Sequence, residues 1–215
     1  MECDIIDTGM RTARENMELD RALLGDLEHT PVIILHLYEW ERPSATYGHF
    51  IKPEEYLKES DLDLAQRPTG GGIVFHTTDF AFSVLVPKSH PAFSENTLEN
   101  YAFVNNKVIE ALGGGELLPV EPEPLDEASK SFCMAKPTKY DVMMEGRKVG
   151  GAAQRRTKHG YLHQGTIFLE RPSDAFLDSV LLEGTRVREG MAQNSYPLKL
   201  TKEEVKQRLI KVFQG

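Results

Sequence analysis

Three consecutive glycines follow an arginine in the segment RPTGGGIVFH, which runs from Arg67 to His76. Glycines beside a strand-like run cost backbone entropy, so a triplet of them needs a reason. Without Cβ atoms, the backbone at Gly70, Gly71 and Gly72 can approach a ligand and donate its N–H groups to a carboxyl, carbonyl or phosphate oxygen. Arg67 would add a fixed positive charge. The segment therefore predicts a ligand-binding loop, and the alternative is a tight turn without a ligand.

A lysine at a predicted hairpin leads into a strand of very small residues in GRKVGGAAQ, from Gly146 to Gln154. Small residues in an otherwise strand-like run leave room for a ligand to lie along the sheet. Lys148, at the start of this run, can polarise a carbonyl group that lies there. The alternative is a solvated lysine in a turn, because most lysines are exposed. Together with the glycine loop, the run favours a binding groove.

Hydrophobic periodicity predicts the elements that would hold these two segments. The run PVIILHLYEW is typical of a buried strand, whereas the three prolines of LPVEPEPLDEASKS, at 118–131, predict a loop. Thr97 is the expected N-cap of a helix that ends at a second glycine triplet. Strands are expected at 4–8, at 31–40, in two pieces within 73–87, and as a meander at 140–144, 149–154 and 161–169; helices are expected at 12–27, 97–112 and 201–213.

The composition excludes several classes of protein. A formal net charge of −8 argues against nucleic-acid binding, and the chain has no apolar run of the roughly 20 residues that cross a membrane, which favours a cytoplasmic protein. Two cysteines, Cys3 and Cys133, are too few for a disulfide framework, and the scattered histidines predict no metal site. The glycine loop is neither a dinucleotide-binding fingerprint nor a Walker loop, because it has no GxGxxG and no Gly-Lys-Ser/Thr. A single domain over residues 1–215 is expected.

The order and spacing of RPTGGGIVFH and GRKVGGAAQRR resemble the paired signature of the lipoate-attachment family, which comprises lipoate–protein ligases and octanoyltransferases and, more distantly, biotin ligases. The segment WERPSATYGHF, and Asn16 with Asp20, resemble two further family segments. Biotin ligases match less well because their glycine loop alternates Gly and Arg. The resemblance implies an α/β (α+β) fold of the biotin/lipoate protein ligase catalytic-domain type, with a two-layer mixed β-sheet flanked by helices.

The resemblance also implies the reaction, which is attachment of an octanoyl or lipoyl group to a lysine of a lipoyl-domain carrier, either a dehydrogenase E2 subunit or the glycine-cleavage H protein. The segment from Cys133 to Asp141 resembles the one that carries the nucleophilic cysteine of octanoyltransferases. A thiolate can take the acyl group from a thioester, and a lysine amine can then form the more stable amide. Acyl carrier protein or another acyl donor is expected to supply the group, and the transferase reaction requires no cofactor. Lys148 near Cys133 would lower the pKa of the thiol and hold the acyl carbonyl.

Two alternatives remain. A lipoate–protein ligase would activate the free acid with ATP and Mg, and Asp141 is compatible with either chemistry. The length of the chain leaves no room for the accessory domain of many ligases, which favours the transferase. A non-catalytic acyl-binding protein is the third reading. The expected catalytic residues are Cys133 and Lys148; the expected substrate-binding residues are Arg67, Gly70, Gly71, Gly72, His76, Tyr140, Asp141, Gly151 and Ala153.

Overall fold

The computed structural model describes residues 2–215 and centres on a seven-stranded sheet in the order β1-β2-β6-β10-β9-β8-β7. Strands β1 and β2 are parallel, and the other neighbours are antiparallel, so the sheet is mixed as predicted. Its strands are β1 (Cys3–Arg11), β2 (Ile33–Trp40), β6 (Asp79–Pro87), β7 (Glu116–Leu117), β8 (Val142–Met144), β9 (Arg147–Thr157) and β10 (Gly160–Phe168).

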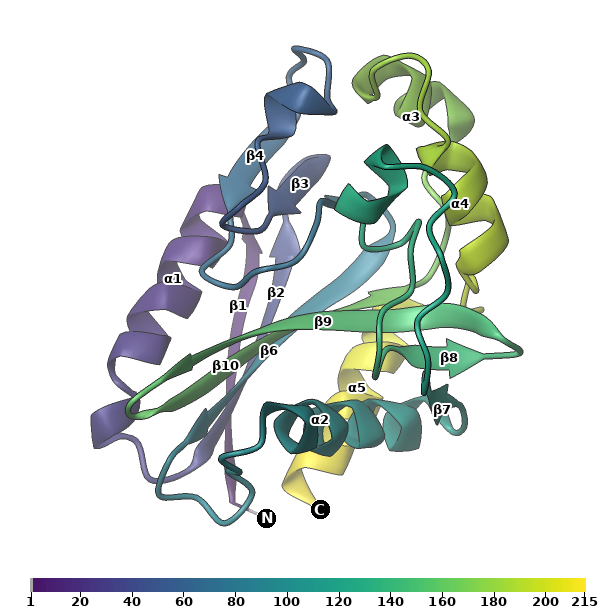
Figure 1. Cartoon of the computed structure of the whole chain (residues 1–215). Helices are drawn as coiled ribbons and strands as arrows, with labels where there is room; N and C mark the ends of the chain where they lie inside the picture. Colours follow the sequence, from purple (N-terminus) through teal and green to yellow (C-terminus); the bar gives the residue numbers. More distant parts are fainter. Residues whose placement is uncertain (1) are drawn as a thin grey trace.

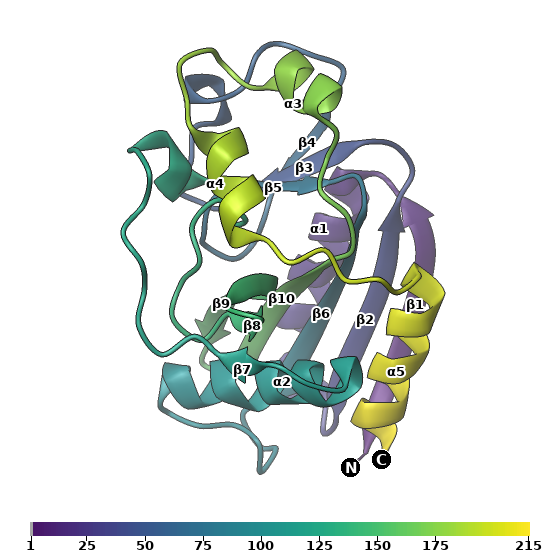
Figure 2. The same cartoon turned by 90° about the vertical axis from the view of Figure 1, so that its right-hand side faces the viewer.

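Helices cover both faces of this sheet (Figures 1 and 2). On β2, Ile33, Leu35 and Leu37 point into the core shared with α2 (Thr97–Leu112) and α5 (Lys202–Gln214). The alternate residues Ile34 and Tyr38 pack on the other face, beneath α1 (Ala13–Gly25). Because side chains alternate across a strand, burial on both faces explains the continuous apolar run that predicted β2.

A second, three-stranded sheet in the order β4-β3-β5 was not predicted. It consists of β3 (Ser44–Tyr47), β4 (Asp63–Gln66) and β5 (Val74–His76), and it lies beyond one end of the large sheet (Figure 1). The unpredicted helices α3 (Asp174–Val180) and α4 (Val187–Asn194) pack against it. Strand β5 is the first of the two pieces expected within 73–87, whereas β3, β4, α3 and α4 were not expected, because such short elements carry few periods of hydrophobic pattern. Single 3₁₀ turns occupy Leu27–His29, Pro53–Glu55 and Ala128–Ser131.

Most predicted boundaries are confirmed within a few residues. The loop at 118–131 contains only a 3₁₀ turn at its end, and Gly113 ends α2 in the left-handed conformation. The predicted N-cap of α2 is wrong, because the Asn96 side chain accepts from the backbone of Leu98 and Thr97 is the first helical residue. Within residues 2–215, no helix is both long and apolar enough to cross a membrane.

Candidate active site

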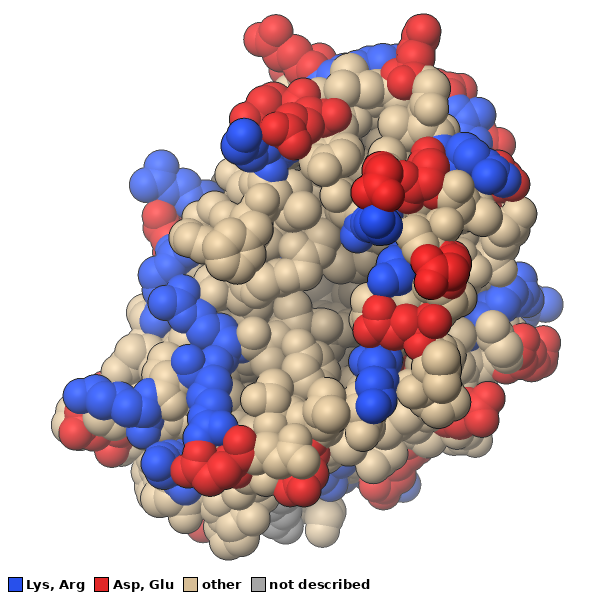
Figure 3. All heavy atoms as spheres, in the orientation of Figure 1, with Lys and Arg blue, Asp and Glu red and all other residues tan. Residues whose placement is uncertain are grey.

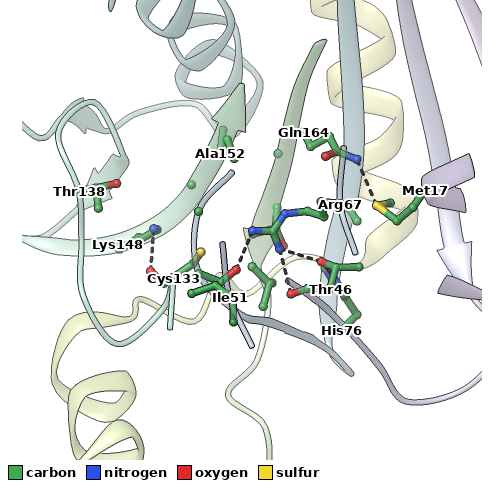
Figure 4. A pocket seen from close by; sticks show the side chains of 18 of the residues that line it. Met17, Thr46, Ile51, Arg67, His76, Cys133, Thr138, Lys148, Ala152 and Gln164 are labelled. Atoms are coloured by element: carbon green, nitrogen blue, oxygen red, sulfur yellow. Dashed lines mark hydrogen bonds between the residues drawn. The ribbon is translucent and has the colours of Figure 1, made fainter. Parts of the chain in front are cut away.

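A cavity of about 250 Å³ opens between the two sheets. Figure 3 shows it as a hollow among mostly uncharged atoms, with charged side chains along its rim. Figure 4 places Cys133 and Lys148 on one side and Met17 and Gln164 on the other. The cavity is lined by Met17, Tyr38, Trp40, Thr46, Ile51, Arg67, Gly71, Gly72, Val74, His76, Ala81, Lys130, Cys133, Lys136, Thr138, Lys148, Gly151, Ala152, Ala153, Gln164, Gly165 and Thr166.

The predicted site residues largely come together here. Those that line the cavity are Arg67, Gly71, Gly72, His76, Cys133, Lys148, Gly151 and Ala153. The other three, Gly70, Tyr140 and Asp141, stand just outside the lining of the described chain. Gly70 still accepts a hydrogen bond from Arg67 through its carbonyl oxygen, and Asp141 pairs with Lys148. Tyr140 contributes its carbonyl oxygen, which accepts from Asn105, and a backbone with φ of 69°.

Backbone pairing brings Cys133 to the glycine loop. The N–H of Cys133 donates to the carbonyl oxygen of Ile73 across 3.0 Å, and the N–H of Ile73 donates to Ser131 across 2.6 Å. A Cβ on Gly72 would overlap the carbonyl oxygen of Ser131, so only glycine allows these two segments to touch. The glycine at 72 therefore places the cysteine, and it also lines the cavity.

Gly71 faces the cavity. Its φ of 85° lies in the left-handed region that favours glycine. A Cβ built on it would lie 3.2 Å from Arg67 Nη2 and 3.7 Å from Cys133 Sγ. The space beside Gly71 is thus shared by a guanidinium group and a thiol, and it is where an acyl carbonyl could meet both.

A hydrogen-bonded chain holds Arg67 in place beneath the loop. Its Nη1 donates to the carbonyl and hydroxyl oxygens of Thr46, each across 2.9 Å. The Thr46 hydroxyl lies 2.8 Å from His76 Nε2, and His76 Nδ1 lies 2.7 Å from Asp79 Oδ2. Arg67 can only donate, so it uses a lone pair of the Thr46 hydroxyl, and that hydroxyl also hydrogen-bonds His76 Nε2. His76 therefore supports Arg67 through Thr46.

Lys148 forms a buried ion pair. Its Nζ lies 2.7 Å from Asp141 Oδ2 and donates to the carbonyl oxygen of Cys133 across 2.8 Å. Both side chains are almost fully buried, at 2% and 3% exposure. Burial raises the pKa of Asp141, while Lys148 and the backbone and hydroxyl of Thr138 counter that rise. A Cβ on Gly151 would overlap the Lys148 ammonium, so the small residue there makes room for this lysine.

The far side of the cavity was missed by sequence reasoning. Gln164 lines it, and its amide nitrogen donates to Asp20 Oδ2 across 2.6 Å while its amide oxygen accepts from Thr69 across 2.7 Å. Asp20 also pairs with His36 Nδ1 at 2.8 Å, and both residues are fully buried. Two features of the sequence could have indicated this network. His36 stands within the apolar run PVIILHLYEW, and Asp20 stands on the apolar face of a helix. Buried polar groups of this kind need hydrogen-bond partners.

Several known proteins are similar to this chain in sequence. The family model of the lipoyl protein ligase A/B catalytic domain matches residues 12–214. Octanoyltransferase LipM of Bacillus subtilis is 33% identical over 205 residues, which cover 88% of this chain and 73% of that protein. Octanoyltransferase LipM of Halalkalibacterium halodurans is 32% identical over 205 residues, covering 88% of this chain and 74% of that protein.

Solved structures share the fold. The putative lipoate protein ligase Ta0514 of T. acidophilum with bound lipoic acid superposes with a TM-score of 0.73 at 23% identity, covering 100% of this chain and 85% of that one. Lipoate-protein ligase A bound with ATP gives a TM-score of 0.74 at 22% identity, with 100% and 85% coverage. These likenesses confirm the predicted α/β fold of the lipoate-ligase catalytic-domain type.

Proposed function

The chain belongs to the lipoyl protein ligase A/B catalytic domain family, and we propose that it transfers an octanoyl group to a lysine of a lipoyl-domain carrier through a thioester on Cys133. One observation carries the proposal: Cys133 Sγ, Lys148 Nζ and the glycine loop meet on one side of a cavity that continues between the two sheets (Figure 4). A cavity of this kind suits an apolar acyl chain whose carbonyl carbon lies beside the thiol.

The reaction has two steps. The Cys133 thiolate attacks the carbonyl carbon of an acyl thioester, the acyl–sulfur bond to Cys133 forms, and the donor leaves as its own thiolate. The neutral amine of the carrier lysine then attacks the Cys133 thioester. The amide bond forms, the carbon–sulfur bond breaks, and the amine proton returns the cysteine to its thiol form. Because the amide product is more stable than the thioester substrate, the reaction is favourable in free energy and needs no nucleotide.

Lys148 is proposed to hold the acyl carbonyl. An ammonium group has three hydrogens, of which one points to Asp141 and one to the Cys133 carbonyl oxygen. Lys148 also lines the cavity, so its third hydrogen is available to a carbonyl oxygen there. A donor fixed in this way stabilises the negative charge that develops on that oxygen in both steps.

The acyl group and partners follow from the relatives. Octanoyl is the group in the names of the LipM proteins, which are the relatives of highest identity reported above. We propose acyl carrier protein as the donor, and either a dehydrogenase E2 lipoyl domain or the glycine-cleavage H protein as the acceptor.

Carrier acylation under four conditions tests the proposal. Purified protein and an apo lipoyl domain are incubated with octanoyl thioester or with free octanoate, each with and without ATP and Mg. Intact-protein mass spectrometry of the lipoyl domain measures acylation. We expect acylation with the octanoyl thioester in the absence of ATP and Mg. Acylation that requires both free acid and ATP would assign the ligase reaction instead, and binding without acylation would leave an acyl-binding protein.

A further inference from the structure

Arg67 is a buried cation without a carboxylate partner. Its side chain is largely inaccessible, with the residue 6% exposed, yet all four of its hydrogen bonds go to neutral oxygens, on Thr46, Gly70 and Gly72. No Asp or Glu within residues 2–215 forms an ion pair with it. An uncompensated charge in the interior is costly, and proteins keep one where it meets an opposite charge during function.

Lys148 differs from Arg67 in this respect. The buried carboxylate of Asp141 lies 2.7 Å from its ammonium, so the positive charge of Lys148 is already neutralised within the fold. Its contact with Cys133 is made to the backbone carbonyl oxygen rather than to the sulfur. The other lysines of the cavity lining, Lys130 and Lys136, also pair with glutamates, so among these lining cations only Arg67 forms no ion pair within residues 2–215.

The guanidinium and the thiol border one small space. A Cβ built on Gly71 would lie 3.2 Å from Arg67 Nη2 and 3.7 Å from Cys133 Sγ. Figure 4 draws the sulfur on the side of Cys133 that faces Arg67. Burial lowers the pKa of Arg67, and the nearby Cys133 counters this through its charge. A thiolate at Cys133 would therefore supply the anion that Arg67 lacks.

We infer that Arg67 is the cation that stabilises the Cys133 thiolate, whereas Lys148 positions the backbone of Cys133 and binds the acyl carbonyl. This inference rests on the proposed role of Cys133 as nucleophile. The four hydrogen bonds of Arg67 fix its guanidinium before any substrate arrives, and Thr46 extends that support to His76 and Asp79. A charge fixed in advance needs little reorganisation when the thiol ionises.

Alkylation of Cys133 by iodoacetamide, a neutral reagent that reacts with thiolates, tests the inference without a carrier or an acyl donor. The pH dependence of the rate therefore reports the ionisation of Cys133 even if the proposed acyl transfer fails. The peptide that contains Cys133 is followed by mass spectrometry. Cys3 is distinguished by its own peptide, and burial raises its pKa to about 11, so it reacts slowly at neutral pH.

Arg67→Gln keeps hydrogen-bond donors and removes the charge. It should slow alkylation at neutral pH by about 10-fold or more, while the rates of variant and wild type converge at high pH where both thiols are ionised. Arg67→Lys keeps the charge but cannot make all four hydrogen bonds, so its rate should lie between those of wild type and Arg67→Gln. Lys139→Gln is the matched control: it removes an exposed cation six residues after Cys133 and outside the cavity lining, and it should leave the profile nearly unchanged. An Arg67→Gln profile that matches those of wild type and Lys139→Gln would overturn the inference.

A second measurement covers the case in which Arg67→Gln does not fold. In the wild type, an uncompensated cation should favour the anionic reagent iodoacetate, so the ratio of iodoacetate to iodoacetamide rates should exceed that of free glutathione several-fold. A ratio equal to or below that of glutathione would contradict a free positive charge beside Cys133.

Discussion

The ammonium of Lys148 donates to the carbonyl oxygen of Cys133 across 2.8 Å, so the lysine holds the backbone of the residue whose sulfur is proposed to react. Its second partner is the buried carboxylate of Asp141. Lys148, expected from the sequence to act at a binding groove, is thus an internal residue, and changing it affects both stability and chemistry.

Lys148→Ala is expected to lower turnover by roughly 100-fold, because it removes a donor to the acyl carbonyl. It should also destabilise the fold by about 3–5 kcal/mol, since Asp141 is left buried without its partner. Steady-state transfer and urea unfolding measure the two effects. Adding Asp141→Asn should recover much of the stability without the turnover, and full recovery of turnover would mean that Lys148 serves only to neutralise Asp141.

Cys133→Ser is expected to abolish both the covalent adduct and carrier acylation, because a serine hydroxyl is far less ionised near neutral pH than a thiol. Wild type incubated with octanoyl thioester alone should gain one acyl mass that hydroxylamine removes. Cys3→Ser is the matched control, since Cys3 lies on β1 outside the cavity lining, and it should behave as wild type. Full activity of Cys133→Ser would refute the thioester intermediate.

Gly71→Ala is expected to weaken acyl binding by at least about 10-fold, or ~1.4 kcal/mol, because the new methyl group enters the space between Arg67 and Cys133. The φ of 85° adds strain at the same position. Titration calorimetry with an octanoyl ligand measures the affinity. Gly70→Ala is the neighbouring control: apart from its two chain neighbours, no described residue has an atom within 4 Å of a Cβ there, so its affinity should remain close to wild type.

Gly72→Ala should act differently from Gly71→Ala. Its methyl group would push against the carbonyl oxygen of Ser131 and displace the segment that carries Cys133. We expect slower formation of the thioester with a smaller effect on the affinity for a non-reactive acyl ligand, measured by adduct mass and by calorimetry. Equal losses in both variants would indicate that the triplet acts as one ligand-binding unit.

His163 is expected to make stability depend on pH. Burial lowers the pKa of His163 to about 3 from its ordinary value of 6.5, so below pH 6.5 the unfolded chain binds a proton that the folded protein excludes. The free energy of unfolding should therefore fall by about 1.4 kcal/mol for each pH unit below 6.5, until pH nears 3. His163→Gln should lose the part of this pH dependence that comes from His163. Urea unfolding of both proteins at several pH values measures the difference. Parallel pH curves for the two proteins would contradict the assignment.

Much of the fold could be predicted from the sequence because its signals are local. The continuous run of β-branched and aromatic residues marked β2, and glycine marked the end of α2. The loop before Cys133 followed from its prolines, since proline cannot donate to a ladder. The two motifs that resemble the lipoate-attachment family also mark segments that meet at one cavity.

Other features depend on contacts between segments far apart in the chain, and only the tertiary structure decided them. Thr69 and Gln164 share a hydrogen bond across 95 positions, and Gly72 makes room for Ser131, which no local pattern could signal. The same holds for charge. The sequence by itself determined that Arg67 and Lys148 lie in the two motifs and that Cys133 lies in the segment between them. Whether the charge of each cation is neutralised depends on which carboxylate the fold buries beside it. Asp141 stands beside Lys148 and no acid of residues 2–215 stands beside Arg67, because folding distributes burial and partners side chain by side chain.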